Sequence, residues 1–266
     1  MNPLKLAIHG AAGRMGKRLV ALGQADERLR IVAALEAPSH PDAGKDAGLV
    51  AGIETIGVEI GPELDRDCGA MIDFSVPTAA MANLEVCREQ RVPLVLATTG
   101  LAAGEDDKIR KAANDIPIVW APNMSLAVNL ALKLVAQAAT ALKDHSSGVD
   151  VEILERHHRY KEDAPSGTAL KFGETIQAIM GQTRTAHGRQ GRPGVRPADE
   201  IGYHAIRVGD HPGEHTIVFA LLGETVEVTV RATSRDAYAL GALTAAKFVA
   251  QQSPGLYSMF DVLGLP

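Results

Sequence analysis

The stretch Leu4-Lys-Leu-Ala-Ile-His-Gly-Ala-Ala-Gly-Arg-Met-Gly16 decides the fold. It opens with a short apolar run that predicts a buried strand, and Met15–Gln24 has the apolar spacing of a helix. Gly10 permits a tight turn, Gly13 lets the backbone approach a pyrophosphate, and Gly16 permits close packing of helix on strand. The free N–H groups of such a helix N-terminus attract phosphate. The spacing G-x-x-G-x-x-G is not the commoner G-x-G-x-x-G, so the glycines alone are a weak signal.

An acidic residue at the end of the next strand strengthens this interpretation. Leu29–Leu35 is apolar and rich in residues typical of strands, and Glu36 follows it, 20 residues after Gly16. An acid at that place can accept hydrogen bonds from an adenosine ribose. The alternative is a glycine-rich turn with a solvated glutamate beyond it. The order strand, turn, helix, strand, acid favours a dinucleotide-binding unit.

The rest of the first half continues the alternation of strands and helices. Such alternation predicts βαβ units, and therefore a Rossmann-type, doubly wound parallel sheet. The expected strands are Ala70–Phe74, Pro93–Ala97 and Pro117–Ala121, and the expected helices lie at about Ala79–Gln90 and Glu105–Asn114.

The pattern changes after residue 125. A long helix, Leu126–Leu142, and a strand, Val149–His157, precede three strands with no helix between them, at Tyr203–Val208, His215–Leu222 and Glu224–Ala232. Consecutive strands predict a mixed, largely antiparallel sheet, so we expect a second domain of the α+β class. The domain boundaries predicted in this way are 1–125 with 235–266 for dinucleotide binding, and 126–234 for the second domain. Gly181–Glu200, with four arginines, shows no apolar period and is interpreted as a long loop.

Composition excludes several classes of protein. The chain has 266 residues, of which 46% are hydrophobic and 22% charged, and this is ordinary for a globular protein. Its net charge of −5 argues against a nucleic-acid partner. No apolar run reaches the roughly 20 residues that span a bilayer, and the N-terminal residues lack the apolar core of a secretory signal. Cys68 and Cys87 are the only cysteines. We therefore expect a cytoplasmic protein with reduced thiols, no membrane partner and no structural zinc.

The chemistry is predicted to lie in Glu155-Arg-His-His-Arg-Tyr-Lys161, at the end of a strand. This run is dense in cationic and proton-donating groups, and Asp163-Ala-Pro-Ser-Gly-Thr168 follows it and opens a helix. The Ser-Gly-Thr backbone can form a nest for an anion. The pattern suits a small anionic substrate that also needs protonation, but a solvated basic loop explains it equally well on these grounds alone. The two adjacent histidines lack a third ligand at suitable spacing, so no metal is expected.

Several segments together resemble the 4-hydroxy-tetrahydrodipicolinate reductase family, also called dihydrodipicolinate reductase. The resemblance covers nearly the whole chain, and the junction of Glu-x-His-His-x-x-Lys with Asp-x-Pro-Ser-Gly-Thr is its most specific part. The segments that carry it are Gly10–Gly16, Ile72–Ser75, Thr98–Gly100, Ala121–Ser125, Glu155–Lys161, Asp163–Ala169 and Gly213–Thr216.

The resemblance implies a role for each matching residue. His157 is the implied proton donor or acceptor and Lys161 the general acid, while His158, Gly167 and Thr168 would hold the carboxylates of the substrate. The cofactor would be contacted by Gly10, Ala11, Ala12, Gly13, Arg14, Met15, Glu36, Ala97, Thr98, Thr99, Ala121, Pro122, Asn123 and Met124.

The implied activity is the NAD(P)H-dependent reduction of a cyclic dicarboxylate, 4-hydroxy-tetrahydrodipicolinate, to tetrahydrodipicolinate in the diaminopimelate route to lysine. Family members are homotetramers built through the sheet of the second domain, so residues 126–234 are implied to bind substrate and to oligomerise. Some members carry an arginine after the acidic residue, where this chain has Ala37. We therefore expect NADH to be used at least as well as NADPH.

Two other functions remain open from the sequence. A catalytically silent dinucleotide sensor would keep the glycine turn without needing His157, His158 and Lys161 together. Another Rossmann reductase would act on a different small dicarboxylate. A semialdehyde dehydrogenase is disfavoured because it needs an activated cysteine, and neither Cys68 nor Cys87 lies in such a setting.

Overall fold

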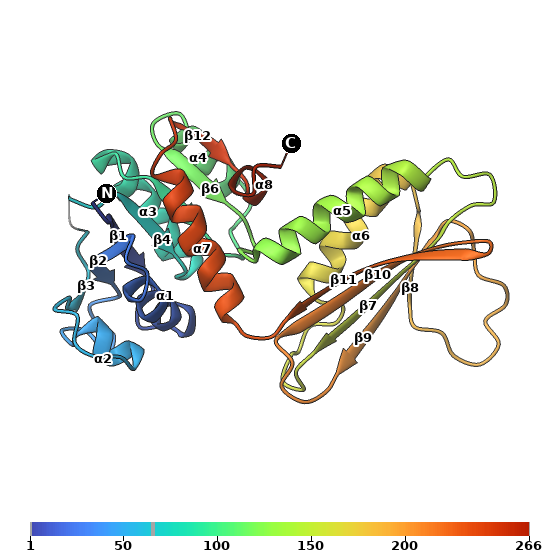
Figure 1. Ribbon diagram of the computed structural model, residues 1–266, viewed down its shortest axis with the longest axis horizontal. Helices are drawn as coiled ribbons and strands as arrows, with labels where there is room; N and C mark the ends of the chain where they lie inside the picture. The colour runs from blue at the N-terminus through green and yellow to red at the C-terminus, as the bar shows by residue number, and fades with distance from the viewer. Residues whose placement is uncertain (1, 65–66, 266) are drawn as a thin grey trace. The chain divides into compact units, whose positions relative to one another are not determined.

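The computed structural model describes residues 2–64 and 67–265 (Figure 1). The chain divides into two compact units. Unit 1 comprises Met1–Leu126 and Asp236–Pro266, and unit 2 comprises Ala127–Arg235. The C-terminal segment thus returns to the unit that the N-terminal segment begins.

Unit 1 is built on a seven-stranded sheet with the strand order β12-β6-β5-β4-β1-β2-β3. Every strand pair in it is parallel. The chain runs outward from β1 in one direction and then from β4 in the other, so the order reverses between β1 and β4. Open parallel sheets bind ligands at this switch point, outside the carboxyl ends of the strands. The strands are β1 (Leu4–His9), β2 (Leu29–Leu35), β3 (Ile60–Gly61), β4 (Ala70–Asp73), β5 (Leu94–Leu96), β6 (Pro117–Trp120) and β12 (Gly255–Tyr257).

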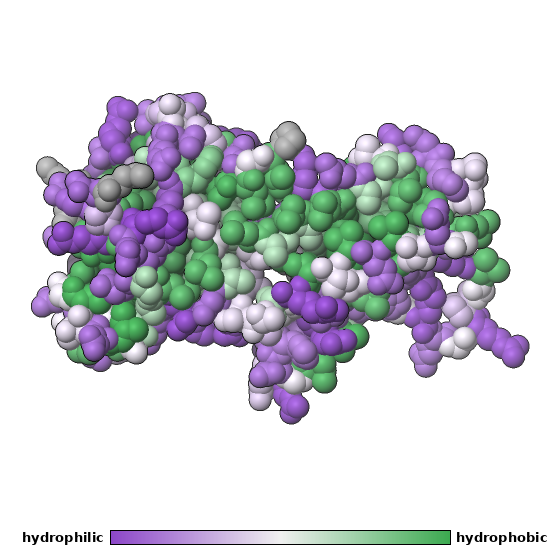
Figure 2. Space-filling view, in the orientation of Figure 1, coloured by the Kyte–Doolittle hydropathy of each residue, from purple (hydrophilic) through white to green (hydrophobic). Residues whose placement is uncertain are grey.

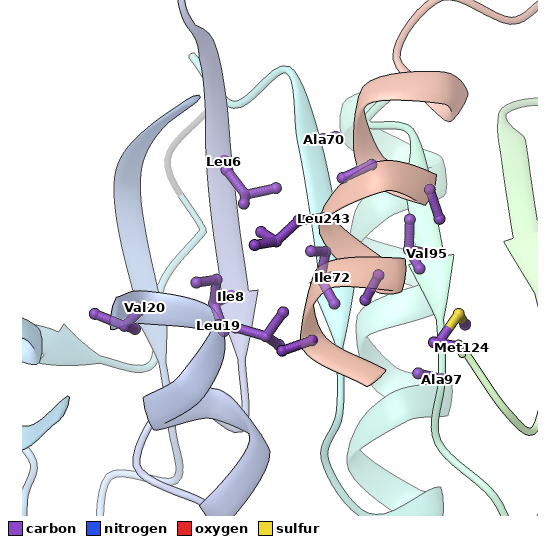
Figure 3. Packing of buried hydrophobic residues seen from close by; sticks show 14 of the residues in the cluster. Leu6, Ile8, Leu19, Val20, Ala70, Ile72, Val95, Ala97, Met124 and Leu243 are labelled. Carbon is purple, nitrogen blue, oxygen red and sulfur yellow. The ribbon is translucent and has the colours of Figure 1, made fainter. Parts of the chain in front are cut away.

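Helices cover both faces of this sheet, as a doubly wound fold requires. Buried residues of α1 and α7 join one hydrophobic cluster with Leu6 and Ile8 of β1, and Leu6 points toward Leu243 of α7 (Figure 3). Buried residues of α3 and α4 join a second cluster with Ala7, which faces the other side of β1. The helices of unit 1 are α1 (Arg14–Gln24), α2 (Ala47–Ala51), α3 (Pro77–Gln90), α4 (Glu105–Ala112), α7 (Asp236–Val249) and α8 (Met259–Val262).

Unit 2 contains a mixed five-stranded sheet with the order β11-β10-β7-β9-β8. The central strand β7 (Asp150–His157) pairs antiparallel with β10 (Gly213–Leu221) and parallel with β9 (Glu200–Arg207). The edges are β11 (Glu224–Ala232) and β8 (Arg184–His187), and the helices are α5 (Leu126–Leu142), which begins in unit 1, and α6 (Gly167–Met180). Together the two sheets confirm the predicted fold class.

One part of the sequence interpretation was wrong. The segment Gly181–Glu200 is not a continuous loop, because β8 lies within it and pairs in parallel with β9. Arg196 then fastens the remaining segment by donating to Asp150 at 2.8 Å and to Glu152 at 3.0 Å. Four paired residues are too few to show an apolar period, and ion pairs across 44 or more residues leave no local signal.

Apolar side chains remain on the surface. Figure 2 shows hydrophobic residues over α5, where Leu130 and Leu134 are exposed. On the sheet face of unit 2 that carries Arg156 and His204, Leu154 and Ile206 are exposed as well. Among the described residues, no helix has both the length and the apolar character to cross a membrane.

The close approach of α1 to β1 generates a stability prediction. A Cβ atom on Gly16 would lie 2.1 Å from the Gly10 carbonyl oxygen and 2.6 Å from Ala11 Cα. Gly16→Ala should therefore destabilise unit 1 by about 1–3 kcal/mol through overpacking. Urea unfolding followed by the fluorescence of Trp120, the single tryptophan, which lies in unit 1, measures this. The control is Gly61→Ala, since a Cβ there meets no atom within 4 Å. Equal midpoints for the two variants would contradict the packing argument.

Candidate active site

The glycine turn after β1 has the shape that the sequence predicts. Gly10 has a φ of +78°, and a Cβ there would lie 2.7 Å from the Phe74 carbonyl oxygen, so only glycine fits. The N–H groups of Gly10 and Ala11 both donate to the Leu35 carbonyl, at 2.9 and 3.1 Å. These bonds fix the turn beside the end of β2, which is the strand that Glu36 follows.

The N-terminus of α1 is open to a ligand. Gly13 is its N-cap, and no side chain among the described residues caps it by a hydrogen bond. Gly13 and Arg14 are exposed, Met15 is half-buried, and Ala12 is buried beneath them. A cradle without side chains at a helix N-terminus fits a pyrophosphate, because backbone N–H groups and the helix dipole both favour the anion.

Glu36 lies at the end of β2, where a ribose would be recognised. Its N–H donates to the Gly61 carbonyl at 3.0 Å, and one carboxylate oxygen accepts the Ala37 N–H at 3.1 Å. Glu36 is half-buried and Ala37 is exposed. The Glu36 carboxylate is therefore held in place by the backbone N–H of the next residue.

The other predicted cofactor residues follow β5 and β6 at the same edge of the sheet. Ala97 and Ala121 are buried, and their N–H groups donate to the Asp73 and Leu96 carbonyls. Thr98 is buried, whereas Thr99 is exposed. The turn Ala121–Ser125 is closed by the Ser125 N–H, which donates to Asn123 Oδ1 at 2.9 Å, while Pro122 is exposed. Met124 is buried in the cluster of α1 and α7 (Figure 3), so its side chain is a core residue.

In unit 2, the Glu155 carboxylate is the centre of a buried hydrogen-bond network. Only 1% of this side chain is exposed. Its oxygens accept two hydrogen bonds from the Arg207 guanidinium at 2.8 Å, one from the Ser166 N–H at 3.1 Å and one from His157 Nδ1 at 2.5 Å. Burial raises the pKa of Glu155, but the bonds from Arg207 and His157 outweigh this and lower its pKa below the usual value. Glu155 is therefore an anion at neutral pH.

His157 is neutral and oriented. Burial lowers its pKa, although the bond to Glu155 acts in the opposite direction. Because a carboxylate only accepts hydrogen bonds, Nδ1 carries the proton and Nε2 is left unprotonated. Nε2 lies beside Gly213, where a Cβ atom would come within 2.9 Å of it. A residue with a side chain at position 213 would therefore displace the His157 ring.

A second imidazole, His215, supports the first. Its ring meets the His157 ring edge-on with centroids 5.2 Å apart, and its Nε2 lies 3.0 Å from Ser166 Oγ. The same Ser166 oxygen accepts the Ala169 N–H and so caps α6. Burial lowers the pKa of His215 to about 4. Ser166 therefore couples the helix start to the histidine pair.

Lys161 and the start of α6 complete the set of predicted residues. The Lys161 ammonium donates to both oxygens of Asp163, at 2.7 and 2.9 Å, and its side chain is 20% exposed. Gly167 is exposed, and a Cβ there would meet no atom within 4 Å, so a ligand has room at the helix N-terminus. Thr168 is half-buried in the first turn of the helix. His158 is half-buried, and its Nδ1 is buried without a hydrogen-bond partner among the described residues.

Sequence reasoning missed several members of these networks. Arg207 and His215 are distant along the chain from Glu155, and pairing across β7, β9 and β10 brings them together. The only signal for His215 was its place in the Gly213–Thr216 segment, and Arg207 had none. Across the described residues, no group of three or more histidines, cysteines or acids is arranged to hold a metal ion.

A doubly wound parallel sheet with a glycine turn at its first helix defines the class of Rossmann-type dinucleotide-binding proteins. Unit 2 adds an oriented histidine and a lysine, which are side chains that can transfer protons.

Comparison with known proteins gives the family. Residues 4–124 match the family described as dihydrodipicolinate reductase, N-terminus, and residues 127–263 match its C-terminus. A 4-hydroxy-tetrahydrodipicolinate reductase of Rhodopirellula baltica is 55% identical, with 99% of this chain and 97% of that protein covered. One of Alkalilimnicola ehrlichii is 46% identical over 98% of this chain and 99% of that protein. The chain belongs to the dihydrodipicolinate reductase family, which confirms the resemblance and the prediction of an oxidoreductase that uses a nicotinamide cofactor.

Solved structures agree on the fold. The dipicolinate-bound dihydrodipicolinate reductase from Paenisporosarcina sp. TG-14 superposes with a TM-score of 0.77 at 22% identity, with 97% of this chain and 98% of that chain covered. GenD2 from gentamicin A biosynthesis, in complex with NAD, gives a TM-score of 0.61 at 13% identity, over 99% of this chain and 91% of that chain. At these identities the likeness concerns the fold alone.

The buried His215 predicts how stability depends on pH. Its pKa is about 4 when folded against an ordinary value of 6.5, so the unfolded chain binds the proton first as the pH falls. The corresponding stability is fully present above 6.5 and is lost toward pH 4, which amounts to roughly 2 kcal/mol between pH 7 and pH 5. Urea unfolding followed by circular dichroism at these two pH values measures it. His215→Gln should lose less stability than the wild type over the same interval. Equal losses would rule out His215 as the cause.

Proposed function

We propose that the chain catalyses the NADH- or NADPH-dependent reduction of 4-hydroxy-tetrahydrodipicolinate to tetrahydrodipicolinate, in the diaminopimelate route of lysine biosynthesis. The observation that carries this proposal is the Glu155–His157 pair near Lys161, together with the space beside Gly167 at the start of α6. The names of the relatives from Rhodopirellula baltica and Alkalilimnicola ehrlichii support the same substrate.

Unit 1 is proposed to hold the cofactor. The bare N-terminus of α1 would bind the pyrophosphate, and Glu36 would bind a ribose. The segments Ala97–Thr99 and Ala121–Met124, which follow neighbouring strands, would flank the nicotinamide. The bound cofactor supplies the hydride for the reaction.

Unit 2 is proposed to hold the dicarboxylate. One carboxylate would lie at the N-terminus of α6, against the backbone of Gly167 and Thr168, where N–H groups and the helix dipole favour an anion. His158 would hold the other, since its Nδ1 has no hydrogen-bond partner among the described residues. In this arrangement residues 126–234 form the substrate-binding domain.

The proton-handling groups follow from the same geometry. Loss of water from the hydroxylated ring gives a conjugated C=C–C=N system. Hydride addition to this system builds electron density on the substrate, and a proton must neutralise it. Lys161 would donate this proton as the general acid, with the Asp163 carboxylate holding the ammonium in place. His157 Nε2 would accept or return a proton, with Glu155 stabilising the imidazolium that forms. The hydride, the proton and the loss of one water together balance the reduction.

A lysine variant tests the general acid. Lys161→Ala should lower kcat by about 100-fold or more, because the variant lacks the proposed proton donor. The assay is oxidation of NADH and of NADPH with freshly prepared 4-hydroxy-tetrahydrodipicolinate. The matched control is Lys171→Ala, since Lys171 is an exposed lysine of α6 that pairs with Glu174. A Lys161→Ala variant within twofold of the wild type would remove Lys161 from the mechanism. A wild type that binds cofactor but does not turn over would favour a dinucleotide sensor.

Cofactor choice gives a second prediction. Glu36 repels a 2′-phosphate, and Ala37 places no cation beside it, so kcat/KM for NADH should equal or exceed that for NADPH. Ala37→Arg should shift the ratio toward NADPH, because a guanidinium pairs with phosphate through two hydrogen bonds. Steady-state kinetics with each cofactor measure both ratios. A clear NADPH preference in the wild type would reject this assignment.

The assembly and the location of the protein are further proposals. We infer a homotetramer formed through the sheet of unit 2, because Leu154 and Ile206 are 37% and 41% exposed on its outer face, where a partner would cover them. The composition supports a cytoplasmic enzyme that binds neither membranes nor nucleic acid.

A further inference from the structure

Asp73 is a fully buried carboxylate that the proposed chemistry does not use. It ends β4 and none of its surface is exposed. Its Oδ1 accepts hydrogen bonds from Thr98 Oγ1 at 2.6 Å, from Ser75 Oγ at 2.8 Å and from the Ser75 N–H at 3.1 Å. Its Oδ2 accepts from His9 Nδ1 at 2.8 Å and from Asn83 Nδ2 at 3.2 Å. Burial raises the pKa of Asp73, but the bonds from His9 and Thr98 outweigh it and lower the pKa below the usual value, so the group is an anion.

These contacts join separate segments at the switch point of the sheet. His9 and Asp73 are partners in the pairing of β1 with β4, which is where the strand order reverses. Thr98 follows the next strand, β5, and Asn83 belongs to α3. One anion therefore connects the ends of three neighbouring strands at the edge where a parallel sheet binds its ligand.

The Thr98 hydroxyl is committed to this network. It donates to Asp73 and also accepts the Ser75 N–H at 3.1 Å, and Thr98 is only 4% exposed. Any contact of Thr98 with a cofactor therefore runs through its backbone. Hydrogen bonds to a buried charge are stronger than neutral ones. The bond from Thr98 to Asp73 therefore fixes the position of the Ala97–Thr99 segment.

We propose that Asp73 is a positioning residue for the nicotinamide cofactor. It acts through Thr98 and Ser75, fixing the backbone against which the nicotinamide rests, and does not itself touch the ligand. The inference rests on the proposed function, which assigns Ala97–Thr99 to the cofactor site. The Asp73 anion is a specific acceptor, since an amide in its place would present an N–H₂ group to donors.

Cofactor binding without turnover is the direct test. Dissociation constants of NADH, measured by its fluorescence on binding, should rise about tenfold in Asp73→Asn, which corresponds to one charged hydrogen bond. In the same variant, KM for the dicarboxylate should change less than twofold, because unit 2 holds it. The matched control is Asp107→Asn, an exposed aspartate in the first turn of α4, which should bind NADH like the wild type.

A double variant tests the route through Thr98. If Asp73 acts by this route, the double variant of Asp73→Asn and Thr98→Val should bind NADH as well as whichever single variant binds it less tightly. Thr98→Ser should stay within twofold of the wild type, because it keeps the hydroxyl. If Asp73→Asn does not fold, the contrast between Thr98→Val and Thr98→Ser decides alone.

Three results would overturn the inference and leave the proposed function standing. A folded Asp73→Asn with wild-type affinity, effects that multiply in the double variant, or equal affinities for Thr98→Val and Thr98→Ser would each remove the positioning role. A wild type that binds no NADH or NADPH overturns the proposed function and this inference with it.

Discussion

The buried carboxylate of Glu155 is the interaction on which unit 2 depends. It accepts hydrogen bonds from β9 through Arg207, from the start of α6 through Ser166 and from His157 on its own strand. Because β7 is the central strand of the sheet, these bonds fix the helix start and the histidine in one frame. Loss of Glu155 or of Arg207 would leave the other charge without its partner, which costs about 3–5 kcal/mol of stability. The positions of the α6 start and of the His157 ring thus depend on one buried charge.

Unit 1 also contains a buried carboxylate that accepts several hydrogen bonds. Asp73 is buried at the end of a strand and holds the segments that follow its neighbours. Buried ion pairs contribute little net stability, because desolvation offsets much of the attraction. The hydrogen bonds to Asp73 instead fix the positions of the groups that donate them. In both units the charge lies behind the proposed ligand-binding residues and fixes their backbone. A reaction between two bound molecules needs backbone held in place in this way, since misplaced reacting groups lose much of the rate enhancement.

The sequence predicted the features that arise from local chemistry and periodicity. The glycine turn, the parallel strands and the position of Glu36 follow from spacing, because each depends on a few neighbouring residues. The partners of Glu155 and Asp73 were not predictable, since Arg207 lies 52 residues from Glu155 and Thr98 lies 25 from Asp73. Strand β8 and the ion pairs of Arg196 with Asp150 and Glu152 were missed for the same reason. The pairing of Lys161 with Asp163 spans only two residues and was within reach of the sequence, but charge spacing alone does not show which side chains meet.

Burial keeps His157 neutral, and the hydrogen bond to Glu155 places its proton on Nδ1 and leaves Nε2 unprotonated. Nitrogen NMR of ¹⁵N-histidine-labelled protein, titrated with pH and assigned with a His157→Gln variant, measures both the protonation state and the tautomer. We predict a His157 pKa below the ordinary value of 6.5 and a neutral form protonated at Nδ1. A pKa at or above 6.5, or a neutral form protonated at Nε2, would contradict it.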